Sequence, residues 1–127
     1  MKKTMKSSTR KPWKELFYDG DFQTPLTEKK ADNYVLPLEM LRLAPSATNA
    51  QPWRVLKLGN VYHFYETHKR NASKEDTLIK QVDLGIAIAH FHQLALDQGL
   101  TGNFEKLPVD QVKMPDDFHY VISWIAK

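Results

Sequence analysis

The chain has 127 residues, of which 42% are hydrophobic, and a formal net charge of +3. This length predicts one domain with a buried core, and the charge is too small to indicate a nucleic-acid partner. The absence of cysteine excludes disulfides, thiolate metal sites and cysteine nucleophiles. The basic start is followed by no apolar run, and no stretch approaches about 18 apolar residues. We therefore expect a cytoplasmic protein with no membrane partner and no metal.

The N-terminal part divides into a tail, an arm and a helix. Residues 1–11 are basic and without periodicity, which predicts a disordered tail ahead of one domain over residues 12–127. Residues 12–26 carry scattered aromatics, which indicates an irregular arm laid against the rest. Apolar residues at three- and four-residue spacing over 38–44 predict a helix, which Pro45 ends.

A hairpin is predicted next. Residues 53–58 and 61–66 are its strands, and Gly59-Asn60 is its turn, because a tight hairpin needs positive φ. Residues 67–81 are polar and predict a loop, with one helical turn capped by Ser73.

The strongest helical pattern covers residues 83–98, with Asp83 as its cap. This helix is apolar almost all round, so it must be buried on several sides, and one small sheet cannot cover it. We therefore expect a partner subunit or a second half. Strands are predicted over 100–104 and 118–125. The second should place one set of side chains on a single face, namely Phe118, Tyr120, Ile122 and Trp124.

The order of helix, hairpin, helix and strand predicts an α+β fold, with a small antiparallel sheet packed on a long buried central helix. Trp53 and Trp124 are expected in the core, and His63 and His68 on the surface. His90 and His92 are two residues apart on a helix and point in different directions, which argues against a metal pair.

Residues 44–53, with the sequence APSATNAQPW, carry the most specific signal. Two prolines and several short polar side chains form a sharp corner between the predicted helix and hairpin. A rigid corner of this kind presents backbone and polar groups to a flat polar ligand. The alternative is a plain helix stop, in which Asn49 and Gln51 only satisfy backbone groups.

This corner, extended to Leu43 and Arg54, resembles the APSAxNxQPWR signature of the FMN-dependent nitroreductases. The segment 83–87, with His90-Phe91 and Gly99-Leu100 after it, resembles a second motif of that family. The ending 120–124 resembles the last strand of a subgroup in which one chain carries two nitroreductase-like halves. The chain is similar to the C-terminal half alone, over about residues 12–127.

The resemblance implies an α+β half-unit with FMN at the boundary between two protomers or two halves. A pyridine nucleotide, NADH or NADPH, would reduce the flavin, and a small nitroaromatic or quinone would accept the electrons. Pro45, Ser46 and Asn49 match positions that contact flavin, and Gln51 matches one that shapes the corner. We take these four residues as the candidate cofactor-binding set and assign no catalytic residue.

One departure limits the resemblance. The family holds the flavin phosphate with an arginine-rich segment, and Arg10-Lys11 has the wrong spacing for it. The chain is therefore expected to supply one wall of a site that a homodimer or a second half completes. Two alternatives remain open: a flavin-free fragment that acts as an interaction module, and a small basic binding domain.

Overall fold

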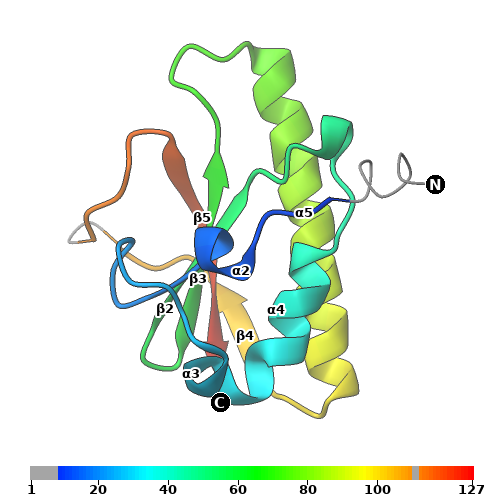
Figure 1. Cartoon of the computed structure of the whole chain (residues 1–127), viewed down its shortest axis with the longest axis vertical. Helices are drawn as coiled ribbons and strands as arrows, with labels where there is room; N and C mark the ends of the chain where they lie inside the picture. The colour runs from blue at the N-terminus through cyan, green and yellow to red at the C-terminus, as the bar shows by residue number, and fades with distance from the viewer. Residues whose placement is uncertain (1–8, 110–111) are drawn as a thin grey trace.

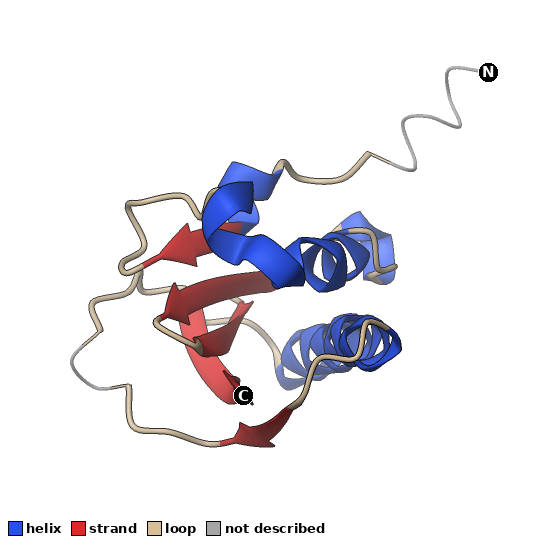
Figure 2. Cartoon of the chain, turned by 90° about the horizontal axis from the view of Figure 1, so that it is seen from below, coloured by secondary structure: helices blue, strands red, loops and turns tan. Residues whose placement is uncertain are grey.

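The computed structural model describes residues 9–109 and 112–127. Within them, helices pack on one face of a five-stranded sheet with strand order β1-β2-β3-β5-β4 (Figures 1 and 2). The strands are β1 (Phe17–Asp19), β2 (Trp53–Leu58), β3 (Val61–Thr67), β4 (Gly102–Glu105) and β5 (Phe118–Ala126). The α-helices are α2 (Trp13–Leu16), α3 (Glu28–Ala31), α4 (Val35–Arg42) and α5 (Lys74–Asp97), and the 3-10 turns are η1 (Asp32–Tyr34) and η2 (Ala47–Asn49). The predicted α+β class is confirmed.

The hairpin is confirmed: β2 and β3 pair antiparallel, and Gly59 has the positive φ, 61°, that its turn needs. The sheet differs from the expected antiparallel one at a single edge. Part of the predicted irregular arm forms β1, which pairs parallel to β2 with Phe17 opposite Val55. The sheet is therefore mixed.

The core lies between the sheet and the helices α4 and α5, which run side by side on it (Figure 2). Trp53 and Trp124 are both buried, as expected. The indole Nε1 of Trp124 donates to the Tyr34 hydroxyl at 2.9 Å, so its polar atom is satisfied inside the core. The ring of Phe91 from α5 packs against Trp124 with centroids 6.0 Å apart.

A β-bulge corrects the prediction that four aromatic and aliphatic residues of β5 share one face. Phe64 pairs with Ile122 but Tyr65 pairs with Tyr120, so Val121 is an extra residue. One extra residue reverses the alternation of side chains beyond it. Ile122 and Trp124 consequently face the helices. Phe118 and Tyr120 face the other side, where their rings meet Phe22 and Tyr65.

The longest helix starts nine residues earlier than predicted. α5 begins at Lys74, and its N-cap Ser73 accepts a hydrogen bond from the Asp76 N–H at 3.0 Å. The predicted cap at Ser73 is confirmed, but the loop predicted over the rest of 74–81 is wrong, and Asp83 lies inside the helix rather than capping it. In the described part of the chain, neither α5 nor any other helix combines the length and apolar character needed to cross a membrane.

Two glycines provide a matched pair of stability predictions. A Cβ on Gly102 would lie 2.5 Å from the Ile125 carbonyl oxygen and 2.7 Å from the Trp124 indole, whereas Gly85 has open space around it within α5. Gly102→Ala should lower the free energy of unfolding by about 1–3 kcal/mol through overpacking. Gly85→Ala should raise it by up to about 1 kcal/mol through helix propensity. Urea unfolding followed by circular dichroism checks both, and equal effects would contradict the close contact at Gly102.

Candidate functional site

The corner between α4 and β2 is held in a costly backbone conformation. Thr48, Asn49 and Gln51 have φ values of 50°, 56° and 50°, in the left-handed region that side chains other than glycine rarely occupy. Each such residue costs roughly 1–3 kcal/mol unless its surroundings enforce it, and such strain gathers at functional sites. This geometry therefore makes the corner the candidate site.

Two hydrogen bonds enforce the conformation. The Ser46 Oγ accepts the Gln51 N–H at 2.9 Å and closes the corner on itself. The Ala47 N–H lies 3.2 and 3.1 Å from the two carboxylate oxygens of Asp83, which accept it from α5. Asp83 is only 5% exposed, so this charge-assisted contact is shielded from water. Asp83, which the sequence predicted as a helix cap, instead anchors the corner to α5.

The four candidate residues divide into two pairs. Pro45 is exposed and Ser46 is half-buried, so both present atoms outward. Asn49 and Gln51 instead hold the N-terminal arm. The Asn49 amide donates to the Thr9 carbonyl at 2.7 Å, and the Gln51 Oε1 accepts the Lys11 N–H at 2.7 Å. These are the backbone-satisfying roles of the packing alternative, and a flavin contact of either residue stays a prediction.

The predicted disordered tail ends beside this corner. Arg10 reaches the Leu43 carbonyl at 3.3 Å and the Asn49 Oδ1 at 3.4 Å, and Arg42 donates to the Lys11 carbonyl at 2.9 Å. Residues 1–8 of the predicted tail lie outside the described residues. The basic pair Arg10-Lys11, whose spacing did not fit an arginine-rich phosphate segment, is therefore placed against the candidate site.

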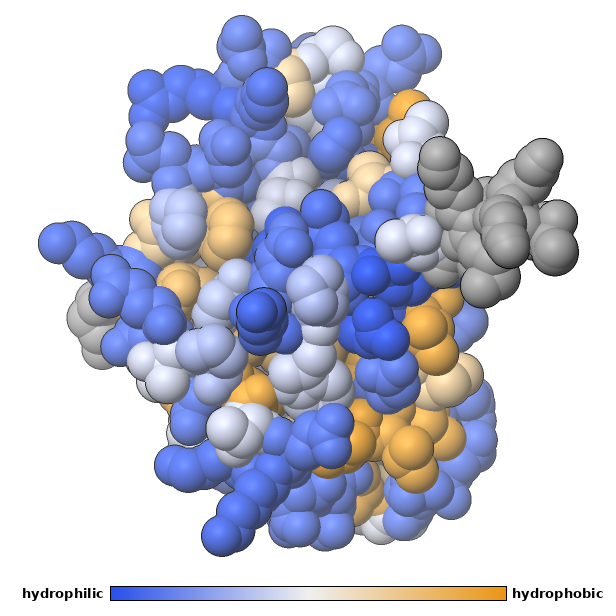
Figure 3. All heavy atoms as spheres, in the orientation of Figure 1, coloured by the Kyte–Doolittle hydropathy of each residue, from blue (hydrophilic) through white to orange (hydrophobic). Residues whose placement is uncertain are grey.

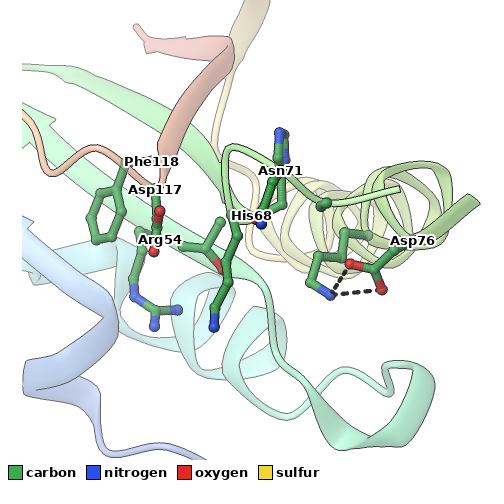
Figure 4. A pocket seen from close by; sticks show the side chains of 10 residues that line it. Arg54, His68, Asn71, Asp76, Asp117 and Phe118 are labelled. Atoms are coloured by element: carbon green, nitrogen blue, oxygen red, sulfur yellow. Dashed lines mark hydrogen bonds and ion pairs between the residues drawn. The ribbon is translucent and has the colours of Figure 1, made fainter. Parts of the chain in front are cut away.

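A cavity of about 440 Å³ adjoins the corner at Arg54 (Figure 4). Its other walls come from the segment after β3, the first turns of α5 and the start of β5, with Lys69, Lys80 and Phe118 among the lining residues. The Lys80 ammonium lies 3.1 Å from the Asp76 carboxylate, so that charge is already paired.

Arg54 is the most buried cation of this cavity, and its Nη2 lies 3.7 Å from a Glu15 carboxylate oxygen. Its Nη1 donates to the Gln51 and Trp53 carbonyls at 3.2 and 2.6 Å, while Nε is buried and has no hydrogen-bond partner within the described residues. Burial lowers the pKa of Arg54 from its ordinary value, because a desolvated guanidinium is less stable when charged. An anion bound here would compensate for that desolvation.

Comparison with known families identifies the chain's relationship. The model of the family described as "Putative TM nitroreductase" matches residues 1–95 of the chain. The chain belongs to this nitroreductase family. No curated protein and no solved structure matches it. The family match spans the corner and most of α5, which confirms the relationship inferred from the APSATNAQPWR sequence. That this nitroreductase-family chain is the second half of a two-lobed protein stays a prediction.

The histidines of this nitroreductase-family chain are more buried than expected. His63 was predicted on the surface, but it is 5% exposed and its Nδ1 lies 2.6 Å from the Ser123 Oγ. The reason is that aromatic side chains such as Tyr120 cover the second face of the sheet as well. His68 is also mostly buried, with 18% of its side chain exposed. His92 is half-buried, and its ring packs on Phe104 and Trp124.

The burial of His63 predicts a pH dependence of stability. Burial lowers its pKa below the ordinary value of 6.5, so the unfolded chain binds a proton more readily than the folded one. The contribution of neutral His63 is fully present above pH ~6.5 and is lost as the pH falls toward the folded-state pKa, by at most about 1.4 kcal/mol per pH unit. Urea unfolding across this range should show the slope in the wild type and a smaller slope in His63→Gln. Identical slopes would contradict the prediction.

Proposed function

We propose that this chain forms one wall of an FMN-dependent oxidoreductase of the nitroreductase type. NADH or NADPH would be the electron donor, and a small nitroaromatic or quinone the acceptor. The observation that carries the proposal is the strained corner, which Ser46 and Asp83 hold in place next to a cavity with a partly unsatisfied arginine. When bound, FMN would supply the hydride chemistry, and the protein would supply binding, orientation and electrostatics.

The residues present fit the cofactor at two points. The Ser46 hydroxyl accepts the Gln51 N–H, and its own proton can still be donated to a polar ring edge. Arg54 and Lys69 line the adjoining cavity and would hold a phosphate. These two side chains would take the place of the arginine-rich segment that the sequence lacks. Pro45 beside Ser46 would contact the ring, and Asn49 would reach it only by exchanging its bond to Thr9.

A second copy of the chain, or a second half, would complete the site. Apolar side chains gather over α4 and α5 in Figure 3, among them Leu36 and Met40 of α4 and Leu43 just after it. On α5, the apolar side chain of Val82 is 55% exposed. Exposed apolar patches of this kind mark interaction surfaces. Val82→Glu should shift a dimer to monomer in sedimentation, and an unchanged sedimentation coefficient in a dimeric protein would exclude this face.

Flavin titration tests the proposed cofactor wall. Ser46→Ala and Asn49→Ala should each weaken FMN binding by roughly tenfold or more, since a lost buried hydrogen bond costs about 1–3 kcal/mol. Quenching of flavin fluorescence in the complete assembly measures the affinity. Thr101→Ala, which removes a hydroxyl outside the site, is the matched control. Equal affinity of Ser46→Ala and Thr101→Ala would contradict the assignment of Ser46.

The second candidate function is a flavin-free interaction module. It is favoured by one observation, that Asn49 and Gln51 both hold the arm in the described chain. Protein colour separates the two. Yellow protein that releases flavin on denaturation supports the oxidoreductase, and colourless protein that does not bind added FMN supports the module.

A further inference from the structure

A second cavity, of about 340 Å³, opens between α5 and the first half of β5, and none of the corner residues lines it. Its polar side is formed by Glu66, His68, His119 and Lys106, and its apolar side includes Leu84 and Ile88 of α5. Cavities of this size that combine an apolar wall with a few polar groups are typical of small-molecule sites.

The chemistry of the polar side depends on a buried carboxylate. Glu66 is 2% exposed, and its Oε2 lies 2.6 Å from the Nδ1 of His68. A carboxylate accepts, so the His68 Nδ1–H is the donor, and this contact fixes the tautomer of the ring. The nitrogen left to take up or release a proton is Nε2, on a side chain that remains 18% exposed.

A second histidine holds the first in position. The rings of His68 and His119 are stacked with centroids 3.8 Å apart and planes 9° from parallel. The His119 Nε2 lies 3.0 Å from the His68 carbonyl oxygen, and because a carbonyl only accepts, His119 donates. His68 is therefore held through its edge, its face and its backbone, which is the pre-organisation that an acid–base group needs.

We propose that this cavity binds a small aromatic molecule with an acidic hydroxyl, and that the His68 Nε2 takes its proton. The ligand O–H bond breaks, an N–H bond forms on Nε2, and the electron pair stays on the ligand oxygen. Glu66 balances the positive charge on His68, and Lys106, which also lines the cavity, would attract the anionic oxygen. Leu84, Ile88 and Val121 receive the hydrocarbon body. This inference goes beyond the proposed flavin chemistry and does not depend on it.

The test uses the full chain without flavin or pyridine nucleotide, and 4-nitrophenol, whose phenolate is yellow. At a pH of about 6.5, where an ordinary imidazole is partly neutral and the free probe is still mostly protonated, wild-type protein in excess should raise the phenolate absorbance at least threefold. His68→Gln should return it to the level of buffer. His90→Gln, a histidine of α5 outside the cavity lining, should match the wild type. The methyl ether 4-nitroanisole, which has no acidic proton, should bind without this colour.

Two results would overturn the proposal: no rise with the wild type, or a rise that persists in His68→Gln. Lys106→Ala provides a second test if circular dichroism shows that His68→Gln is misfolded. Lys106 is exposed, so its loss leaves the core intact. Lys106→Ala should weaken probe binding several-fold. Unchanged probe binding in Lys106→Ala would then count against an anionic oxygen in this cavity.

Discussion

Trp124→Ala should lower the free energy of unfolding by about 3–5 kcal/mol, the loss expected when a buried tryptophan is truncated. Trp124 is 1% exposed, and its ring meets those of Phe91, Phe104 and His92. Truncation leaves a large cavity between β5 and α5 and removes the indole N–H that donates to the Tyr34 hydroxyl. Urea unfolding, followed by circular dichroism, measures the change.

Trp124→Phe separates packing from hydrogen bonding. It keeps an aromatic ring in the core but removes the indole N–H, so the Tyr34 hydroxyl loses its donor at a cost of about 1–3 kcal/mol. The loss should therefore be clearly smaller than for the alanine variant. A loss under about 1 kcal/mol in Trp124→Ala would show that β5 does not pack on α5 in this way.

Asp83→Ala should release the corner from α5. The variant removes both oxygens that accept the Ala47 N–H, and a buried hydrogen bond to a charged group contributes about 1.5–3 kcal/mol. Without this anchor, the left-handed residues Thr48, Asn49 and Gln51 lose part of the surroundings that enforce them. Amide hydrogen exchange at Ala47 should become at least tenfold faster, and FMN affinity should fall by more than in Ser46→Ala.

Ser73→Ala is the matched control, because it removes the actual cap of α5. It should cost about 1 kcal/mol of stability and leave exchange at Ala47 unchanged. Slow exchange at Ala47 in Asp83→Ala would contradict the anchor.

The elements that local chemistry determines could be predicted from the sequence. Gly59 identified the hairpin turn, and Pro45 the end of the helix before it. Ser73 was predicted to cap a helical turn, and it does cap α5. The continuous helix from Lys74 was missed because its first turns are polar and carry no apolar periodicity. The bulge at Val121 was missed because register depends on the partner strand, which a strand's own alternation does not reveal.

The candidate site was predictable to a similar extent. The APSATNAQPWR sequence located the corner and led to the correct family. The anchor at Asp83 and the cavity at Arg54 join residues far apart in the chain, so spacing could not predict them. One signal was available: Asp83 stands at the start of an apolar helical run, where a buried carboxylate needs a partner.

The bond between Asn49 and Thr9 has a practical meaning for anyone who produces this protein. In a variant that begins at Thr9, a purification handle or fluorescent label would be attached next to the corner and would compete for space with a molecule that approaches it. Lys127 donates to the Thr101 carbonyl at the opposite end of β5, far from the corner in Figure 1. We expect a handle on that end to leave the corner accessible.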